Sequence, residues 1–179
     1  MNVEQARFNM IEQQIRPWEV LDERVLSLFT EIPRERFVPE AEQKLAFADI
    51  EIPIGDGETM LSPKVEGRIL QALTVQETDT VLAVGTGSGY TTALLAKLAK
   101  YVYSVDINDK FIDSAKQKLA ASEIKNVHLE EGDAATGWEK FAPYDVIAIT
   151  GSLPIFPESY QHTLKVGGRM FVIVGDTPI

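Results

Sequence analysis

Short apolar, β-branched runs alternate along the chain with stretches whose apolar residues recur at helical spacing. The runs predict buried strands at 80–84, 101–106, 127–130, 144–150 and 169–174, with helices at 91–98 and from about 109. Strands that alternate with helices imply right-handed crossovers. The pattern therefore predicts an α/β fold with a doubly wound, mostly parallel sheet.

The part of the chain before the first strand is predicted to be helical and then extended. Apolar positions at helical spacing indicate helices over 5–14 and 22–30, the second of which Asp22 would cap. An extended stretch over 47–57 ends in a turn, and a helix over 63–73 leads to the first strand. We therefore expect an amino-terminal segment, residues 1–60, followed by the α/β domain, residues 61–179.

The first predicted strand ends in three alternating glycines, Gly85, Gly87 and Gly89. Glycine permits backbone angles that a Cβ forbids, and the following helix points its free N–H groups at a ligand over the loop. A dinucleotide fingerprint needs glycine or alanine six positions along, but Tyr90 or Thr92 stands there, which argues against NAD or FAD. A tight strand-to-helix turn without a ligand is the alternative for such a cluster.

Polar residues follow the other predicted strands at the same edge of the sheet. Asp106, at the end of the second strand, can accept hydrogen bonds from both hydroxyls of a ribose. The alternative is that it caps the next helix, although Asn108 and Asp109 are better placed for that. Asp133 follows the third strand, where an ordinary Gly-Asp turn is the alternative. Thr150 ends the fourth strand.

Composition narrows the classes of partner. The 179 residues carry a net charge of −10 and their basic residues are scattered, which argues against nucleic acid. No apolar run approaches the roughly 20 residues of a membrane span, and the amino terminus lacks the features of a signal peptide, so a cytoplasmic location without a membrane partner is expected. With no cysteine and two isolated histidines, His128 and His162, no metal site is predicted.

Two segments before the first strand are specific: I-P-R-E-R-F-V-P over 32–39 and P-I-G-D-G-E-T over 53–59. With the glycine loop they resemble the protein-L-isoaspartate O-methyltransferase family, and the resemblance extends over essentially the whole chain. It implies a Rossmann-like methyltransferase fold with S-adenosylmethionine as cofactor and S-adenosylhomocysteine as product. It also implies protein repair, in which the carboxylate of an isoaspartyl peptide or protein accepts the methyl group.

The resemblance assigns roles to particular residues. The glycine loop would hold the methionine part of the cofactor, Asp106 its ribose, and Asp133 with Ala134 its adenine. The whole cofactor set is Gly85, Thr86, Gly87, Ser88, Gly89, Asp106, Ile107, Asp133, Ala134 and Thr150, and the methyl-transfer set is Thr59, Leu61 and Ser62. Residues 61–179 would then be the cofactor-binding domain, and residues 1–60 would cover the active site.

The chain departs from the family pattern near the transfer site. Members typically continue G-x-T-[IV]-S, whereas Leu61 occupies the serine position here and Ser62 stands one residue later. Ala83 replaces an acid that is common before the glycine loop. These changes affect cofactor binding less than isoaspartyl specificity. A family methyltransferase with another, small acceptor and a cofactor-binding module without transferase activity are the alternatives.

The last predicted strand has an apolar run from Met170 to Val174. Methyltransferase sheets of this type usually add two more strands beyond it. An apolar strand edge without a neighbour pairs readily with another chain. Either the chain is a shortened form or another molecule covers this edge, and we expect self-association to a homo-oligomer, or aggregation, through residues 169–175.

Overall fold

The structure is a computed structural model that describes residues 2–175. Its main sheet has five strands in the order β5-β4-β3-β6-β7, and every neighbouring pair is parallel. The strands are β3 (Thr80–Val84), β4 (Tyr101–Asp106), β5 (Val127–Glu131), β6 (Tyr144–Leu153) and β7 (Leu164–Val174). The predicted α/β class and parallel sheet are confirmed, and the fifth strand begins at Leu164 rather than at 169.

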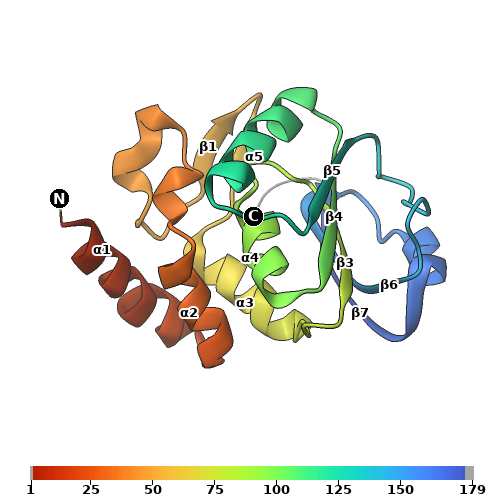
Figure 1. Ribbon diagram of the computed structural model, residues 1–179, viewed down its shortest axis with the longest axis horizontal. Coiled ribbons are helices and arrows are strands. Elements are labelled where there is room, and N and C mark those ends of the chain that lie inside the picture. The colour runs from red at the N-terminus through yellow and green to blue at the C-terminus, as the bar shows by residue number, and fades with distance from the viewer. Residues whose placement is uncertain (1, 176–179) are drawn as a thin grey trace.

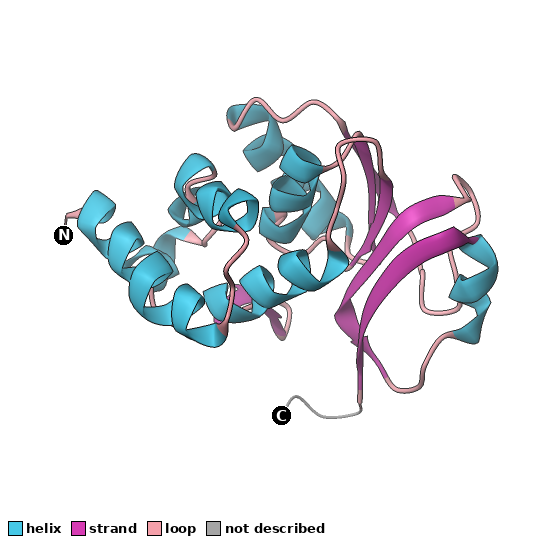
Figure 2. Cartoon of the chain, turned by 90° about the horizontal axis from the view of Figure 1, so that it is seen from below, coloured by secondary structure: helices cyan, strands magenta, loops and turns pink. Residues whose placement is uncertain are grey.

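Three α-helices lie on one side of this sheet (Figures 1 and 2). They are α3 (Pro63–Leu73), α4 (Tyr90–Leu98) and α5 (Asp109–Ala121), which match the predicted helices closely. Because side chains alternate along a strand, Val81 and Ala83 join the larger core under these helices, while Leu82 and Val84 join a smaller core behind the sheet. The two faces of β3 are therefore both buried.

The opposite face has a thinner cover, visible in Figure 2 beyond the two long strands. It consists of the 3-10 helix η5 (Glu158–Thr163) and the segment 132–143, which the structure describes without an α-helix. Tyr160 of η5 is fully buried in the smaller core, and Trp138 packs against it. The crossover between β5 and β6 is thus made by irregular chain.

The amino-terminal helices pack on the larger core rather than forming one of their own. Met10, Phe29 and Phe37 are fully buried there beside residues of α3 and α4. Asp22 caps its helix by accepting a hydrogen bond from the N–H of Arg24, as predicted. The elements are α1 (Val3–Met10), the π-helical turn η1 (Ile11–Ile15), η2 (Arg16–Trp18), α2 (Glu23–Glu31), η3 (Arg34–Arg36) and η4 (Glu40–Leu45).

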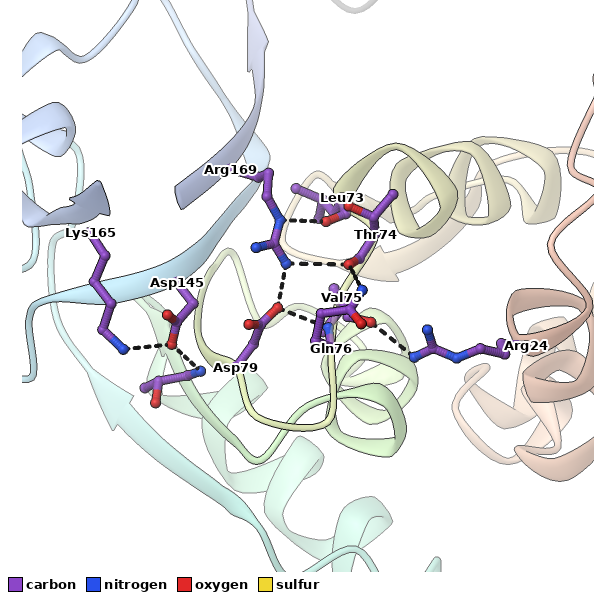
Figure 3. A network of polar contacts seen from close by, with 10 residues as sticks. Arg24, Leu73, Thr74, Val75, Gln76, Asp79, Asp145, Lys165 and Arg169 are labelled. Atoms are coloured by element: carbon purple, nitrogen blue, oxygen red, sulfur yellow. Dashed lines mark hydrogen bonds and ion pairs between the residues drawn. The ribbon is translucent and has the colours of Figure 1, made fainter. Parts of the chain in front are cut away.

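A polar network joins the amino ends of the sheet strands to α3 (Figure 3). The guanidinium of Arg169, in β7, donates to the carbonyl oxygens of Leu73 (3.0 Å) and Thr74 (3.3 Å) and pairs with Asp79. Asp79 also accepts a hydrogen bond of 2.8 Å from the N–H of Gln76. This network anchors β7 at the end of the sheet opposite the glycine loop.

Strand β7 lies at one edge of the sheet formed by residues 2–175, and most of its side chains are partly exposed. Pairing of this edge with a second copy stays a prediction. In the same range, no helix has the length and apolar character needed to cross a membrane.

Candidate functional site

A cavity of about 470 Å³ lies at the carboxyl ends of β3, β4 and β6. A small antiparallel hairpin, β1 (Ile52–Gly55) and β2 (Glu58–Met60), forms its opposite wall. The structure brings most of the residues predicted from the sequence to this cavity: Thr59, Leu61, Gly85, Thr86, Gly87, Ser88, Asp106, Ile107, Asp133, Ala134 and Thr150. Ser62 and Gly89 are absent from the lining.

The glycine loop has little room for side chains. Gly85 has φ +90°, and a Cβ there would lie 2.7 Å from the backbone nitrogen of Gly151. Gly89 has φ +83° and begins α4, where a Cβ would lie 2.9 Å from that of Ala115. Gly89 therefore allows helix packing, while Gly85 keeps the backbone next to the cavity. The free N–H groups of the first turn of α4 follow directly.

Asp106 is 9% exposed and faces the cavity. One carboxylate oxygen accepts a hydrogen bond from the N–H of Gly87 and the other from that of Asn108, both at 2.9 Å. Asn108, not Asp106, caps α5 through the N–H of Lys110, so the capping alternative is wrong. Because a carboxylate has about four acceptor sites, two remain for the hydroxyls of a ligand.

Asp133 also lines the cavity, after the strand next to that of Asp106, and accepts a hydrogen bond of 2.9 Å from the N–H of Ala135. This contact is the ordinary turn that the sequence left as an alternative, and it uses only one oxygen. Thr150 donates to the carbonyl oxygen of Gly85 at 3.1 Å and so ties β6 to the glycine loop. The adenine role of Asp133 and Ala134 stays a prediction.

The tip of the hairpin reaches the turn after β4. The Asp56 carboxylate accepts a hydrogen bond of 2.8 Å from the Asn108 side-chain amide and lies 3.4 Å from the Lys110 ammonium. These two partners, Asn108 first, hold the pKa of Asp56 below its usual value. Since both segments line the cavity, this contact joins its two walls.

The structure distinguishes Leu61 from Ser62. Leu61 is partly buried and lines the cavity, whereas Ser62 is 5% exposed and lies outside the lining. Ser62 precedes α3, and its carbonyl oxygen accepts hydrogen bonds from the N–H groups of Val65 and Glu66. The residue that carries the hydroxyl is therefore part of the start of α3 and not of the cavity lining. The part that Thr59, Leu61 and Ser62 take in methyl transfer stays a prediction.

Several polar residues of the cavity, among them Asp56, Asn108 and Glu66, were not predicted from the sequence. Glu66 forms a buried ion pair with Arg34, whose guanidinium also donates to the carbonyl oxygens of Leu61 (2.6 Å) and Ala46 (3.0 Å). Burial raises the pKa of Glu66 to about 7, although Arg34 opposes the shift. An acid on the apolar face of a predicted helix is the sequence signal that could have found it.

The cavity carries negative charge. Its lining includes five carboxylates, Asp56, Glu58, Glu66, Asp106 and Asp133, and no lysine, arginine or histidine among the described residues. Within 2–175 no cluster of three or more histidine, aspartate or glutamate side chains could hold a metal ion. An acid with acceptor sites left for a ligand, a glycine loop and a negative wall fit S-adenosylmethionine, whose sulfonium is positive.

Fold and site together define an S-adenosylmethionine-dependent methyltransferase. The family model described as Protein-L-isoaspartate(D-aspartate) O-methyltransferase matches residues 5–178. The chain is 39% identical over 176 residues to a protein-L-isoaspartate O-methyltransferase of Petrotoga mobilis, covering 98% of this chain and 83% of the relative. It is 36% identical to protein-L-isoaspartate O-methyltransferase 1 of Geotalea uraniireducens, covering 99% and 81%. The chain therefore belongs to the protein-L-isoaspartate(D-aspartate) O-methyltransferase family.

Solved structures agree with this assignment. A protein-L-isoaspartate O-methyltransferase superposes with a TM-score of 0.79 at 27% identity, covering 95% of this chain and 54% of the other. A Plasmodium falciparum structure described as a putative protein-L-isoaspartate O-methyltransferase in complex with S-adenosyl-L-homocysteine has a TM-score of 0.82 at 17% identity, covering 98% and 85%. Because its sequence identity is low, the Plasmodium falciparum structure supports the fold alone.

Proposed function

We propose that this methyltransferase methylates the free carboxylate of isoaspartyl residues in peptides or proteins. One observation carries the proposal: the glycine loop with Asp106 and the segment from Thr59 to Leu61 face each other across a single cavity. A cofactor held on one wall and an acceptor held on the other can then meet. The named relatives support isoaspartyl residues as the acceptor class.

The reaction needs little acid–base catalysis from the residues of the chain. S-adenosylmethionine supplies, when bound, an activated methyl group on a sulfonium. A carboxylate acceptor is already an anion near pH 7, so no general base is needed. The residues of the cavity would bind and orient the two partners, and the hairpin with its Asp56 contact would exclude water.

A methyltransferase with a different acceptor is the second candidate. Leu61 offers no hydroxyl where the family typically has one, and the cavity lining is acidic without a basic partner for an incoming carboxylate. Like charges repel strongly in a partly dry cavity. A neutral or cationic small acceptor would meet no such penalty.

Transfer of a labelled methyl group tests the proposal. An isoaspartyl peptide is compared with the same peptide containing ordinary aspartate and with a panel of neutral and cationic acceptors. We expect weak transfer to the isoaspartyl peptide alone, and faster transfer by Leu61→Ser if that position carries the acceptor contact. Ser62→Ala is measured beside it and shows whether the hydroxyl one residue later takes part in the transfer. Transfer to another acceptor but not to the isoaspartyl peptide favours the second candidate.

We also propose that residues 1–60 cover the active site and residues 61–179 bind the cofactor. The hairpin residues in the cavity wall support this division. A cytoplasmic location, the lack of a nucleic acid partner and a homo-oligomeric state stay predictions from the sequence. Sedimentation across a concentration series, with Val172→Lys on β7, tests the last of them.

A further inference from the structure

The Arg34–Glu66 pair lies between the two walls of the cavity. On one side, Arg34 donates to the carbonyl oxygen of Leu61, which belongs to residues 59–62, here called the acceptor segment. On the other side, the second carboxylate oxygen of Glu66 accepts a hydrogen bond of 3.3 Å from the hydroxyl of Thr91. Thr91 lies in the first turn of α4, directly after the glycine loop. One ion pair thus links acceptor and cofactor walls.

The surroundings of the pair make it rigid. The side chains of Arg34 and Glu66 are 0% and 1% exposed. The Arg34 guanidinium lies 5.2 Å from the centre of the Tyr90 ring, and that ring packs 5.3 Å from Phe37. A planar guanidinium with several donors in a fixed fork holds its partners in one geometry. Because a buried charge that loses its partner is strongly unfavourable, the two groups move together.

We propose that Arg34 and Glu66 are positioning residues that couple cofactor binding to the placement of the acceptor segment. A ligand in the glycine loop restrains the first turn of α4 and with it Thr91. Glu66 and Arg34 pass that restraint to the carbonyl group of Leu61. Arg34 lies outside the cavity lining, and Glu66 acts on the acceptor segment only through Arg34. The inference rests on the proposed function only in assigning methyl transfer to the acceptor segment.

Hydrogen exchange tests the coupling without any acceptor. The exchange of backbone amides in the acceptor segment is measured with and without S-adenosylhomocysteine. In the unmodified protein we expect bound ligand to slow this exchange at least about fivefold, the lower end of typical coupling between sites. In Glu66→Gln the slowing should be lost, while calorimetry shows the ligand still bound. Asp79→Asn, which disturbs the distant pair with Arg169, should keep the slowing.

Thr91→Val gives a second route if Glu66→Gln fails to fold. It removes only the hydroxyl link and keeps the side-chain volume, so it should abolish the slowing and leave the fold intact. Equal slowing in Thr91→Val and in the unmodified protein contradicts the proposal. Equal slowing in a folded Glu66→Gln also contradicts it, as does the absence of slowing in the unmodified protein with ligand bound.

Turnover separates this inference from the proposed function. With whichever acceptor is methylated, Glu66→Gln should lower kcat more than tenfold and change KM little, while Asp79→Asn changes neither. A parallel loss of kcat in both variants indicates general destabilisation and contradicts a positioning role. If isoaspartyl peptides are not methylated at all but ligand-dependent slowing is present, the acceptor assignment fails and the coupling stands.

Discussion

Two acids at the amino end of the parallel sheet have ion-pair partners, and two acids at its carboxyl end have none within residues 2–175. At the amino end, Asp79 pairs with Arg169, and Asp145 lies 2.8 Å from the ammonium of Lys165 (Figure 3). At the carboxyl end, neither Asp106 nor Asp133 has an ion-pair partner among the described residues. Asp79 and Asp145 are held by partners within the chain, whereas the unpaired acids beside the cavity are available to a ligand.

The backbone shows the same contrast. Gly85 and Gly89 adopt positive φ beside atoms that a Cβ would strike, whereas Gly167, in the irregular part of β7 between Leu164 and Arg169, has φ +81° with nothing within 4 Å. Only the first two require glycine for close approach as well as for conformation. Substitutions at corresponding places in the two ends should therefore separate effects on ligand binding from effects on stability.

Gly85→Ala should have the largest effect on binding. Its Cβ would strike the backbone of Gly151, so the loop or the end of β6 must shift into the cavity. We expect affinity for S-adenosylhomocysteine to fall by more than about 100-fold, measured by calorimetry. Gly167→Ala is the control, since it adds strain of roughly 1–3 kcal/mol without a clash near the site. Similar losses of affinity in both variants would contradict the role of the loop.

Much of this fold could be predicted from the sequence because its signals are local. Capping by Asp22, apolar spacing in 63–73 and glycines after β3 each act over a few residues. The π-helical turn at 11–15 and the irregular crossover at 132–143 were not predicted, because their geometry depends on packing against distant parts of the chain. The earlier start of β7 depends on pairing with β6.

Asp106→Ala should come next in effect on binding. Loss of a charged acceptor for the ribose hydroxyls should weaken S-adenosylhomocysteine binding by roughly 1.5–3 kcal/mol. Part of this loss comes from a change in the glycine loop, because Asp106 also accepts a hydrogen bond from the N–H of Gly87. Calorimetry measures it, and NAD should not bind to either form. Saturable NAD binding without a response to S-adenosylhomocysteine would exclude the cofactor assignment.

The candidate site was only partly predictable for a different reason. The residues at the ends of strands follow from the topology, since parallel strands all end at one edge. The contacts of Arg34 with Leu61 and Glu66 join segments 27 and 32 residues apart. Nothing in the local sequence of either segment specifies its partner. The same holds for Asp56 and Asn108, which are 52 residues apart.

Asp79→Asn should lower stability without changing ligand affinity, whereas Asp106→Ala should lower ligand affinity. It removes the charge that pairs with Arg169 and weakens the anchor of β7, while the cavity lies at the other end of the sheet. We expect the free energy of unfolding to fall by about 2 kcal/mol, since the pair is only partly buried. Affinity for S-adenosylhomocysteine should stay within about twofold at temperatures where the variant is folded. A large loss of affinity would mean that the two ends are not independent.

The smallest expected effect is the pH dependence of stability that two acids cause, one in each region. Burial raises the pKa of Glu66 from its usual value of about 4.5 to about 7, so its contribution to stability is present below about pH 4.5 and is lost as pH rises through 7. For Asp145, burial opposes ionisation, but Lys165 and the N–H of Thr80 hold the pKa below 3.8. Its contribution is present above that value and is lost as pH falls.

Urea unfolding at several pH values measures whether each acid raises or lowers the free energy of unfolding as the pH changes. Between pH 5 and 7 the unmodified protein should lose on the order of 1 kcal/mol relative to Glu66→Gln, because the charged carboxylate loses more hydration than Arg34 returns. Relative to Asp145→Asn it should instead lose stability on going from pH 6 to 3, by less than about 1 kcal/mol since this acid is only partly buried and its partner Lys165 is exposed. If stability changed with pH in the same direction for both acids, the cavity wall would stabilise a charged carboxylate as the amino end of the sheet does. The contrast between the two regions would then rest on their geometry alone.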